Sequence, residues 1–201
     1  GTNLALNAAG NVADYLLETG LFAKAIEFYE ECFVLLRICI TSGLERTIQK
    51  RPREVERQLY MGLANAYSQT GNPKKAKELC EKCLEINENS GIERRESNCY
   101  EFIGRMHFYL GQCKESLAFH EKSLELRKKI KDKKKVATSS CAISSLYYNL
   151  CQYDEALKYA QEALEISEEY KIGKWRESLT LAQPLNTEKD MVVCKGVRQF
   201  A

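Results

Sequence analysis

The sequence repeats itself every 40 residues, and this period limits the possible folds more than any other feature of the chain. Eight positions carry the repeat, which in the second copy are Tyr60, Leu63, Ala64, Tyr67, Gly71, Ala76, Cys80 and Leu84. Adding 40 once gives the third copy, over 100–124, and adding it twice gives the fourth, over 140–164. An earlier copy over 9–33 precedes the second by 51 residues, so 11 extra residues separate these two. Four copies of one unit predict an array of repeats rather than a domain around one central core.

The spacing within each copy predicts two helices joined by a short turn. Apolar residues recur at steps of three, one and three, and after the turn at steps of four, which places them on one face of each helix. Gly20, Gly71 and Gly111 stand where the first helix ends, a position that commonly takes left-handed dihedral angles, and Cys151 replaces this glycine in the fourth copy. Each copy is therefore expected to form a helical hairpin.

Composition supports an all-α fold, because the 201 residues include only three prolines and 11 glycines among many helix formers. One hairpin cannot bury its apolar face alone, so the hairpins are expected to stack into a right-handed α-solenoid. We expect a repeat domain over 4–178, with hairpins at about 4–43, 55–91, 93–131 and 133–171. We also expect a divergent tail over 179–201.

Two segments interrupt the pattern. The 11 extra residues lie between Leu36 and Arg53, where either the second helix continues past Cys39 or Ser42 and Gly43 end it before a short helix over 44–50. We favour the second arrangement. A fifth first-helix begins near Trp175, but Pro184 falls in what would be its interior and would break it, so this repeat is expected to be incomplete.

The repeat unit resembles the tetratricopeptide repeat. The family signature of large, small, aromatic, Gly and Ala positions is matched over 63–67, Gly71 and Ala76, and again from Tyr147 through 154–157 to 163–164. Common tetratricopeptide repeats are about 34 residues long. The longer period is similar to that of Pins/LGN-type and rapsyn-type scaffolds and, at a slightly longer period, of kinesin light chain.

The resemblance implies a concave groove, lined by the first helix of each hairpin, that grips an extended peptide or a partner helix. The residues expected to line it are Asn11, Asp14, Asn65, Gln69, Arg105, Tyr109, Tyr148 and Asn149. Amide side chains can bond both N–H and C=O groups of a peptide, and Arg and Tyr are frequent anchors at protein interfaces. The function predicted first is therefore a non-enzymatic scaffold or adaptor for a protein partner.

Two departures from known subfamilies narrow the range of partners that we expect for this chain. Heat-shock co-chaperones hold a carboxylate with a Lys/Asn clamp, but the corresponding positions here are Gly10, Asp14 and Gly62, so chaperone tails are not expected. Pins/LGN repeats carry recurrent pairs of groove asparagines, which survive here only in part, for example as Asn11 with Asp14. The partners of those subfamilies are therefore not carried over to this chain.

A basic run over 127–135 supports a second hypothesis. An RNA or an anionic surface could bind a patch formed by Arg127, Lys128, Lys129, Lys133, Lys134 and Lys135. Alternatively, these residues favour the negative end of a helix and keep a loop in water, which is the interpretation that we prefer. A third hypothesis is a regulatory repeat region attached to an enzyme outside the sequence given.

No pattern indicates catalysis, a cofactor or a metal. Phosphate-binding loops, nucleophile elbows and zinc-protease spacings do not occur in the sequence. Cys80 and Cys83 lack a second ligand pair, and His107 and His120 occupy the aromatic positions of the repeat, so core packing with the two rings near one another is expected. We expect neither an enzyme nor a metal site.

The remaining composition points to an intracellular, cytoplasmic protein. The 30 basic residues nearly balance the 28 acidic ones, so a nucleic acid partner is not expected. The nine cysteines are an odd number spread through helical pattern, which indicates reduced thiols. No membrane-spanning run and no secretory leader are present, and a start at Gly1 suggests a piece of a longer protein. Exposed ends of a stacked array also predict self-association.

Overall fold

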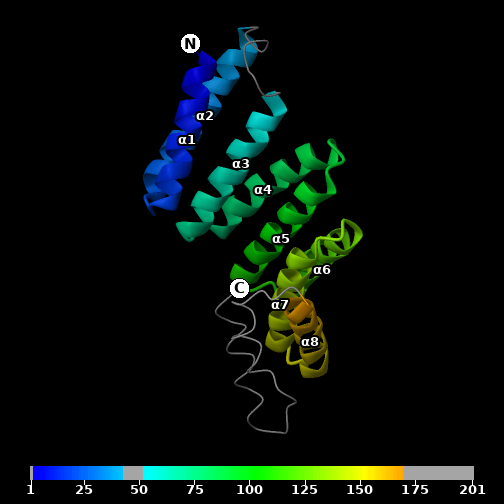
Figure 1. Cartoon of the computed structure of the whole chain (residues 1–201). Helices are drawn as coiled ribbons and strands as arrows, with labels where there is room; N and C mark the ends of the chain where they lie inside the picture. Colours follow the sequence, from blue (N-terminus) through cyan, green and yellow to red (C-terminus); the bar gives the residue numbers. More distant parts are fainter. Residues whose placement is uncertain (1, 43–51, 170–201) are drawn as a thin grey trace. The chain divides into compact units, whose positions relative to one another are not determined.

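The computed structural model describes residues 2–42 and 52–169 of the chain. The described part contains helices and no strand, which confirms the predicted all-α class. The helices are α1 (Thr2–Glu18), α2 (Phe22–Thr41), α3 (Pro52–Gln69), α4 (Pro73–Glu88), α5 (Glu93–Tyr109), α6 (Cys113–Lys129), α7 (Lys133–Asn149) and α8 (Tyr153–Glu169) (Figure 1).

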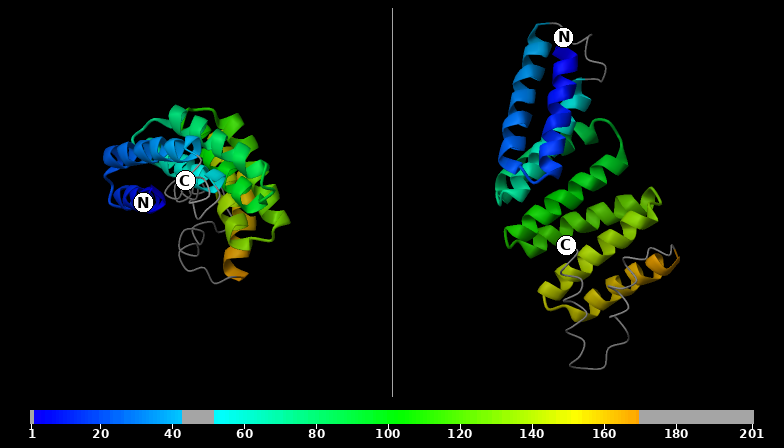
Figure 2. Two further views of the ribbon diagram at one scale, coloured as in Figure 1. Left: turned by 90° about the horizontal axis from the view of Figure 1, so that it is seen from above. Right: turned by 60° about the vertical axis from the view of Figure 1, so that its left-hand side comes forward.

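The chain divides into two compact units, Gly1–Ile92 with α1–α4 and Glu93–Ala201 with α5–α8. In the first unit α2 packs against both α1 and α3, and α4 packs against α3. In the second unit α6 packs against both α5 and α7, and α8 packs against α7 (Figures 1 and 2). Each unit is therefore a pair of stacked helical hairpins.

The insertion ends α2 where the sequence predicts. Helix α2 stops at Thr41, and the backbone N–H of Ser42 donates to the carbonyl oxygen of Ile38 at 3.0 Å. Ser42 is therefore the C-cap of α2. The predicted short helix over 44–50, the fifth first-helix near Trp175 and the tail over 179–201 lie outside the described residues.

The turns within the hairpins follow the predicted glycine rule. Gly20, Gly71 and Gly111 have φ angles of 80°, 75° and 75°, in the left-handed region that glycine enters without steric cost. Cys151, which replaces this glycine, adopts the same conformation with a φ of 59°. The turn geometry is thus set by the packing of the hairpin and is kept even where the residue does not favour it.

A polar cap starts the second helix of the second hairpin. The side-chain oxygen of Asn72 accepts a hydrogen bond from the backbone N–H of Lys75 at 3.3 Å, and Pro73 occupies the first turn of α4. Asp132 caps α7 in the same way, with Lys135 N–H as donor at 3.2 Å. These caps satisfy amides that a helix leaves unpaired at its start.

Small residues bring the two helices of a hairpin close together. In the third hairpin Ser116 Oγ on α6 donates to the carbonyl oxygen of Gly104 on α5 at 2.8 Å. In the fourth, Ser144 Oγ on α7 donates to the carbonyl oxygen of Ala156 on α8 at 2.7 Å. The two bonds join equivalent positions of the repeat with donor and acceptor helices exchanged. Small side chains at these positions therefore let the two helices of a hairpin approach closely.

No described helix is both long enough and apolar enough to cross a membrane. The eight cysteines within the described residues form no disulfide with one another, and most of them are buried. They therefore act there as small apolar side chains, as the sequence predicts.

Candidate functional site

The second unit contains a cavity between the first helices of its two hairpins. Helices α5 and α7 form its walls, His120 of α6 contributes from the second helix, and its volume is about 70 Å³. The residues that line it are Glu101, Arg105, Phe108, Tyr109, His120, Thr138, Ala142, Ser145 and Leu146. Two of these lining residues, Arg105 and Tyr109, are among those that the sequence predicts to line a groove.

His120 is held in the cavity by a close contact with α5. A Cβ atom added to Gly104 would lie 2.7 Å from the imidazole Cδ2, so only glycine leaves room for the ring at this position. His120 is 3% exposed, and its Nδ1 has no hydrogen-bond partner. Burial lowers the pKa of His120 to about 4, so the imidazole is neutral at pH 7.

Arg105 carries the second unpartnered nitrogen of the cavity. Its guanidinium carbon lies 5.1 Å from the centroid of the Phe102 ring, a contact typical of a cation over an aromatic face. Its Nε is buried and has no hydrogen-bond partner. The Phe102 ring thus covers one face of the Arg105 guanidinium, while the Nε–H donor has no acceptor.

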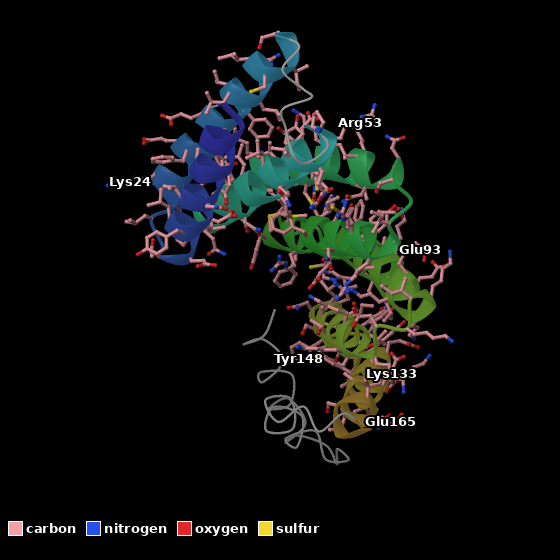
Figure 3. The ribbon with its side chains drawn as sticks, turned by 45° about the horizontal axis from the view of Figure 1, so that its top comes forward. Lys24, Arg53, Glu93, Lys133, Tyr148 and Glu165 are labelled. Carbon is pink, nitrogen blue, oxygen red and sulfur yellow. The ribbon has the colours of Figure 1, made fainter. Side chains whose placement is uncertain are left out.

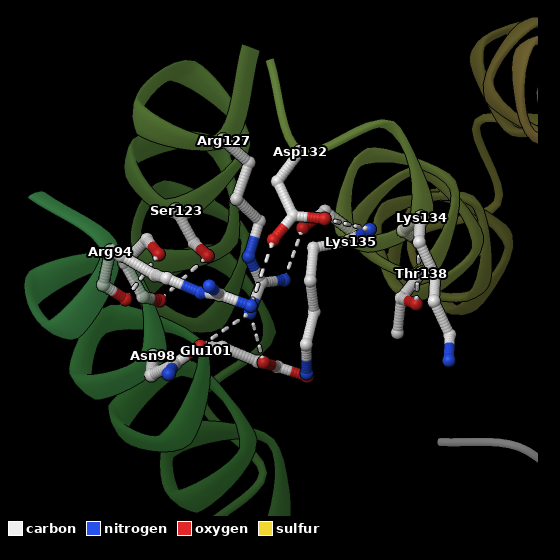
Figure 4. A network of polar contacts seen from close by, with 11 residues as sticks. Arg94, Asn98, Glu101, Ser123, Arg127, Asp132, Lys134, Lys135 and Thr138 are labelled. Carbon is white, nitrogen blue, oxygen red and sulfur yellow. Dashed lines mark hydrogen bonds and ion pairs between the residues drawn. The ribbon is translucent and has the colours of Figure 1, made fainter. Parts of the chain in front are cut away.

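The acidic residue of the cavity is already engaged. Glu101 forms an ion pair with Arg127, which is 1% exposed and also donates to Ser139 Oγ at 2.5 Å and to Asn98 Oδ1 at 3.3 Å (Figure 4). Burial alone would raise the pKa of Glu101, but Arg127, Lys135 and Arg105 hold it below its ordinary value. Glu101 therefore serves as the counter-ion of a buried arginine.

The hydroxyl groups of the lining donate to their own helices. Thr138 Oγ1 donates to the carbonyl oxygen of Lys134 at 3.1 Å, and Ser145 Oγ donates to that of Cys141 at 3.2 Å. The buried lining nitrogens that lack a partner in the described part of the chain are those of Arg105 and His120. A ligand in this cavity would be recognised by these two groups.

The first unit has the register equivalent of this site, but there the side chains satisfy one another. Tyr29 corresponds to His120, Asp14 to Arg105 and Gly62 to Ala142. The phenol of Tyr29 donates to Asp14 Oδ1 at 2.5 Å, and its ring lies so close to Gly62 that an added Cβ would be 2.5 Å from Cζ. Burial and Asp14 raise the pKa of Tyr29, so its hydroxyl stays protonated.

The predicted groove residues of the second unit divide into two pairs. Arg105 and Tyr109 line the cavity, and Tyr109 is 55% exposed at its rim. Tyr148, labelled in Figure 3, instead packs edge-on against Tyr153 at 5.7 Å between centroids. Asn149 Nδ2 donates to the carbonyl oxygen of Ser145 at 2.6 Å. The structure thus brings together only the first pair at the cavity.

The predicted groove residues of the first unit lie on α1 and α3. Asn11 and Gln69 are exposed and Asn65 is half-buried, so their amides are accessible to a ligand. Asp14 is exposed but accepts the hydrogen bond of Tyr29.

Sequence reasoning placed His120 in the core and missed its part in the cavity. The other histidine, His107, behaves as expected for a packed residue. Its ring stacks on Phe119, at 5.1 Å between centroids. Its Nδ1 is 2.7 Å from Gln112 Oε1, so His107 has a polar partner and His120 Nδ1 has none. Comparing His120 with its three register equivalents, Tyr29, Cys80 and Ala160, could have revealed that side-chain size differs at this position.

The predicted anion patch needs one correction. Arg127 lies in the interior and is paired with Glu101, so it does not belong to a surface patch. Lys128 forms an ion pair with Glu162 at 2.6 Å, and Lys129 forms one with Glu93. Lys133 and Lys134 are exposed and Lys135 is half-buried. The basic run is therefore distributed over interior and surface positions rather than forming one face.

Within the described ranges, no group of three or more His, Cys, Asp and Glu side chains is arranged to hold a metal ion.

Comparison with known proteins identifies the repeat. A family model described as tetratricopeptide repeat matches residues 56–129 and 96–169, which together span more than half of the chain. A sequence search of the curated proteins finds no match.

Solved structures share the fold at low sequence identity. BtubC (BKLC) from P. vanneervenii is 17% identical with a TM-score of 0.69, covering 99% of this chain and 80% of its own. A putative kinesin light chain from Podospora anserina with nearly identical TPR-like repeats is 15% identical with a TM-score of 0.66, covering 98% and 94%. A Rap protein complexed with competence and sporulation factor is 13% identical with a TM-score of 0.70, covering 98% and 54%. The chain belongs to the tetratricopeptide repeat family, and its hairpins have the architecture of that family's α-solenoids.

Proposed function

We propose that this chain is a non-enzymatic, intracellular interaction module that binds a peptide segment or a helix of a protein partner on its first-helix faces. The observation that carries the proposal is the cavity between α5 and α7, where two buried nitrogens lack partners and an exposed aromatic ring stands at the rim. Buried polar groups without partners cost free energy unless a ligand or water satisfies them.

The family supports this proposal. Tetratricopeptide repeats commonly mediate binding between proteins, and one structural neighbour is a Rap protein complexed with competence and sporulation factor. That complex concerns the Rap protein, whose similarity to this chain is one of fold. The exposed amides of Asn11 and Gln69 would add hydrogen bonds to a bound backbone in the first unit.

A random dodecapeptide library displayed on phage tests the proposal on the full chain. We expect the selection to return peptides whose binding is weakened at least tenfold by Arg105→Glu, because this change reverses the charge at the cavity. Arg94→Glu is the matched control, since Arg94 lies on the same helix, is 74% exposed and does not line the cavity. Fluorescence polarisation with the synthetic peptides measures both affinities. A selection without binders, or equal losses in both variants, would contradict binding at this face.

Salt dependence separates this proposal from binding of RNA or an anionic surface. Binding through phosphate contacts weakens steeply as salt is added, whereas a partly buried contact in the cavity responds less. The interior position of Arg127 and the ion pairs of Lys128 and Lys129 reduce the charge that the basic run offers to phosphates. We therefore expect no RNA binding that depends on Lys133 and Lys134.

A further inference from the structure

We infer that the cavity between α5 and α7 receives one acidic side chain, Asp or Glu, of the bound peptide. This inference rests on the proposed function and specifies the chemistry of the ligand at one point. Arg105 and His120 are the groups that would hold the carboxylate.

The charge of the cavity favours an anion. One carboxylate, Glu101, is surrounded by three cationic groups, Arg105, Arg127 and Lys135, which act together on its ionisation. Glu101 is bound to Arg127 by an ion pair and is therefore not free to receive a cationic ligand. The net local charge is positive, and it lies in a partly buried place where solvent screens it less than at the surface.

The free hydrogen-bonding groups match a carboxylate. Arg105 Nε–H is a donor, and His120 Nδ1 is a donor in the tautomer that carries its proton there. A carboxylate accepts several hydrogen bonds and donates none, so its two oxygens can satisfy both nitrogens at once. Thr138 and Ser145 already donate to carbonyl oxygens of their own helix, which leaves recognition to the arginine and the histidine.

The size of the cavity limits what can enter. Its volume of about 70 Å³ is less than half that of an engineered cavity of about 150 Å³ that admits benzene. An aromatic side chain is therefore too large, whereas a carboxylate on a short aliphatic stem fits against the apolar wall of Phe108, Ala142 and Leu146.

The first unit shows which group completes the same site. There the register equivalent of Arg105 is Asp14, so the chain supplies its own carboxylate, and Tyr29 donates to it at 2.5 Å. In the second unit the equivalent positions hold a cation and a short imidazole, and both unpartnered nitrogens remain. A carboxylate from a partner would supply what Asp14 supplies in the first unit.

The selection of dodecapeptides on the full chain gives the first test. We expect binders to share Asp or Glu at one fixed position. Replacing that residue by Asn or Gln should weaken binding to the wild-type chain about 10–100-fold, the range expected for hydrogen bonds to a charged group. In the Arg105→Gln variant the same peptide change should cost less than threefold, whereas Arg94→Gln should keep the full loss.

A second variant tests the cavity without removing charge. Ala142→Leu places a larger side chain in the lining and should weaken the acidic peptide to the level of its amide analogue, with thermal unfolding recorded to establish that the chain folds. Isotope-labelled His120 provides a direct signal, because the ¹⁵N shift of Nδ1 should move when the acidic peptide binds and should not move with the amide analogue.

The outcomes separate the two proposals. Absence of any binder contradicts the proposed function and this inference together. Binders that depend on Arg105 but show no acidic position, or acidic binders that lose equal affinity in Arg94→Gln and Arg105→Gln, contradict the inference alone. In the second case general surface charge, and not the cavity, would hold the peptide.

Discussion

The site around Tyr29 in the first unit and the site around His120 in the second occupy the same register, yet they differ in how their polar groups are satisfied. In the first, a phenol and a carboxylate pair within the chain, and the ring lies against Gly62. In the second, an imidazole that fills less space leaves a cavity beside Ala142, and nitrogens of His120 and Arg105 lack partners. One repeat position can thus be either internal packing or a site open to a ligand, depending on side-chain size and charge.

Among the tests of this comparison, breaking the buried ion pair between Glu101 and Arg127 in the second unit should have the largest effect on stability. Glu101→Gln should lower the free energy of unfolding by about 3–5 kcal/mol, because it leaves the Arg127 charge buried without its counter-ion. Urea denaturation at pH 7 measures the change. Lys128→Gln removes the more exposed pair with Glu162 and should cost less than about 1 kcal/mol.

The first unit suggests how that loss could be recovered. The register equivalents of Glu101 and Arg127 are Gly10 and Leu36 in the first hairpin and Met61 and Asn87 in the second, so neither hairpin of the first unit carries this ion pair. The double variant Glu101→Met with Arg127→Leu should therefore recover most of the stability, since apolar residues can replace a buried ion pair. A double variant as unstable as Glu101→Gln would show that Ser139 and Asn98 also require the guanidinium.

The contact between Tyr29 and Gly62 should be the next most sensitive feature. Gly62→Ala places a methyl group 2.5 Å from the phenol ring, which must move, so the free energy of unfolding should fall by up to about 3 kcal/mol. Gly10→Ala is the matched control, because an added Cβ there meets nothing within 4 Å and alanine favours a helix. Equal stability of the two variants would show that the phenol is not held in this space.

Acid should lower the free energy of unfolding through His120 in the second site. Its folded pKa of about 4 lies below the value of about 6.5 in the unfolded chain, so between these values the unfolded chain binds a proton that the folded chain does not. Stability from the neutral ring is complete above pH 6.5 and falls as the pH falls, by about 2 kcal/mol between pH 7.5 and pH 5. Among the charged neighbours of this ring, Glu101 raises the pKa of His120, whereas Arg105 and Arg127 lower it.

Urea denaturation at the two pH values measures this loss in the wild-type chain. The comparison chain carries His120→Tyr with Ala142→Gly, which copies Tyr29 and Gly62 of the first site and removes the imidazole that titrates in this range. We expect it to lose about 2 kcal/mol less than the wild type over the same interval. Equal pH dependence of the two chains would assign the loss to other groups.

Much of the fold was predictable because it depends on short-range patterns. Helix faces, the turns at Gly20, Gly71 and Gly111 and the cap at Asn72 follow from spacing and residue type over a few positions. The same local reasoning placed Arg127 in a surface patch with Lys128 and Lys129. It was wrong for Arg127 because neighbours in sequence point about 100° apart around a helix, so one faces the interior and the next faces water.

The candidate site was predictable only in part. Arg105 and Tyr109 follow from their place on the first helix of a repeat, and both line the cavity. Glu101, His120 and Ala142 were missed, because the cavity depends on residues of three helices that meet through packing and not through spacing. Gly104 shows the same limit, since its role is to leave space for a ring 16 positions away.

The sequence by itself determined that this chain is an array of helical hairpins of tetratricopeptide type, because a 40-residue period with helical spacing leaves few other ways to bury its apolar faces. Only the tertiary structure decided which repeat is closed by its own side chains and which keeps a cavity. That difference arises where Tyr29 meets Gly62 and Asp14, and where His120 meets Ala142 and Arg105. Side-chain volume and charge from neighbouring hairpins combine there, and neither can be read from one copy alone.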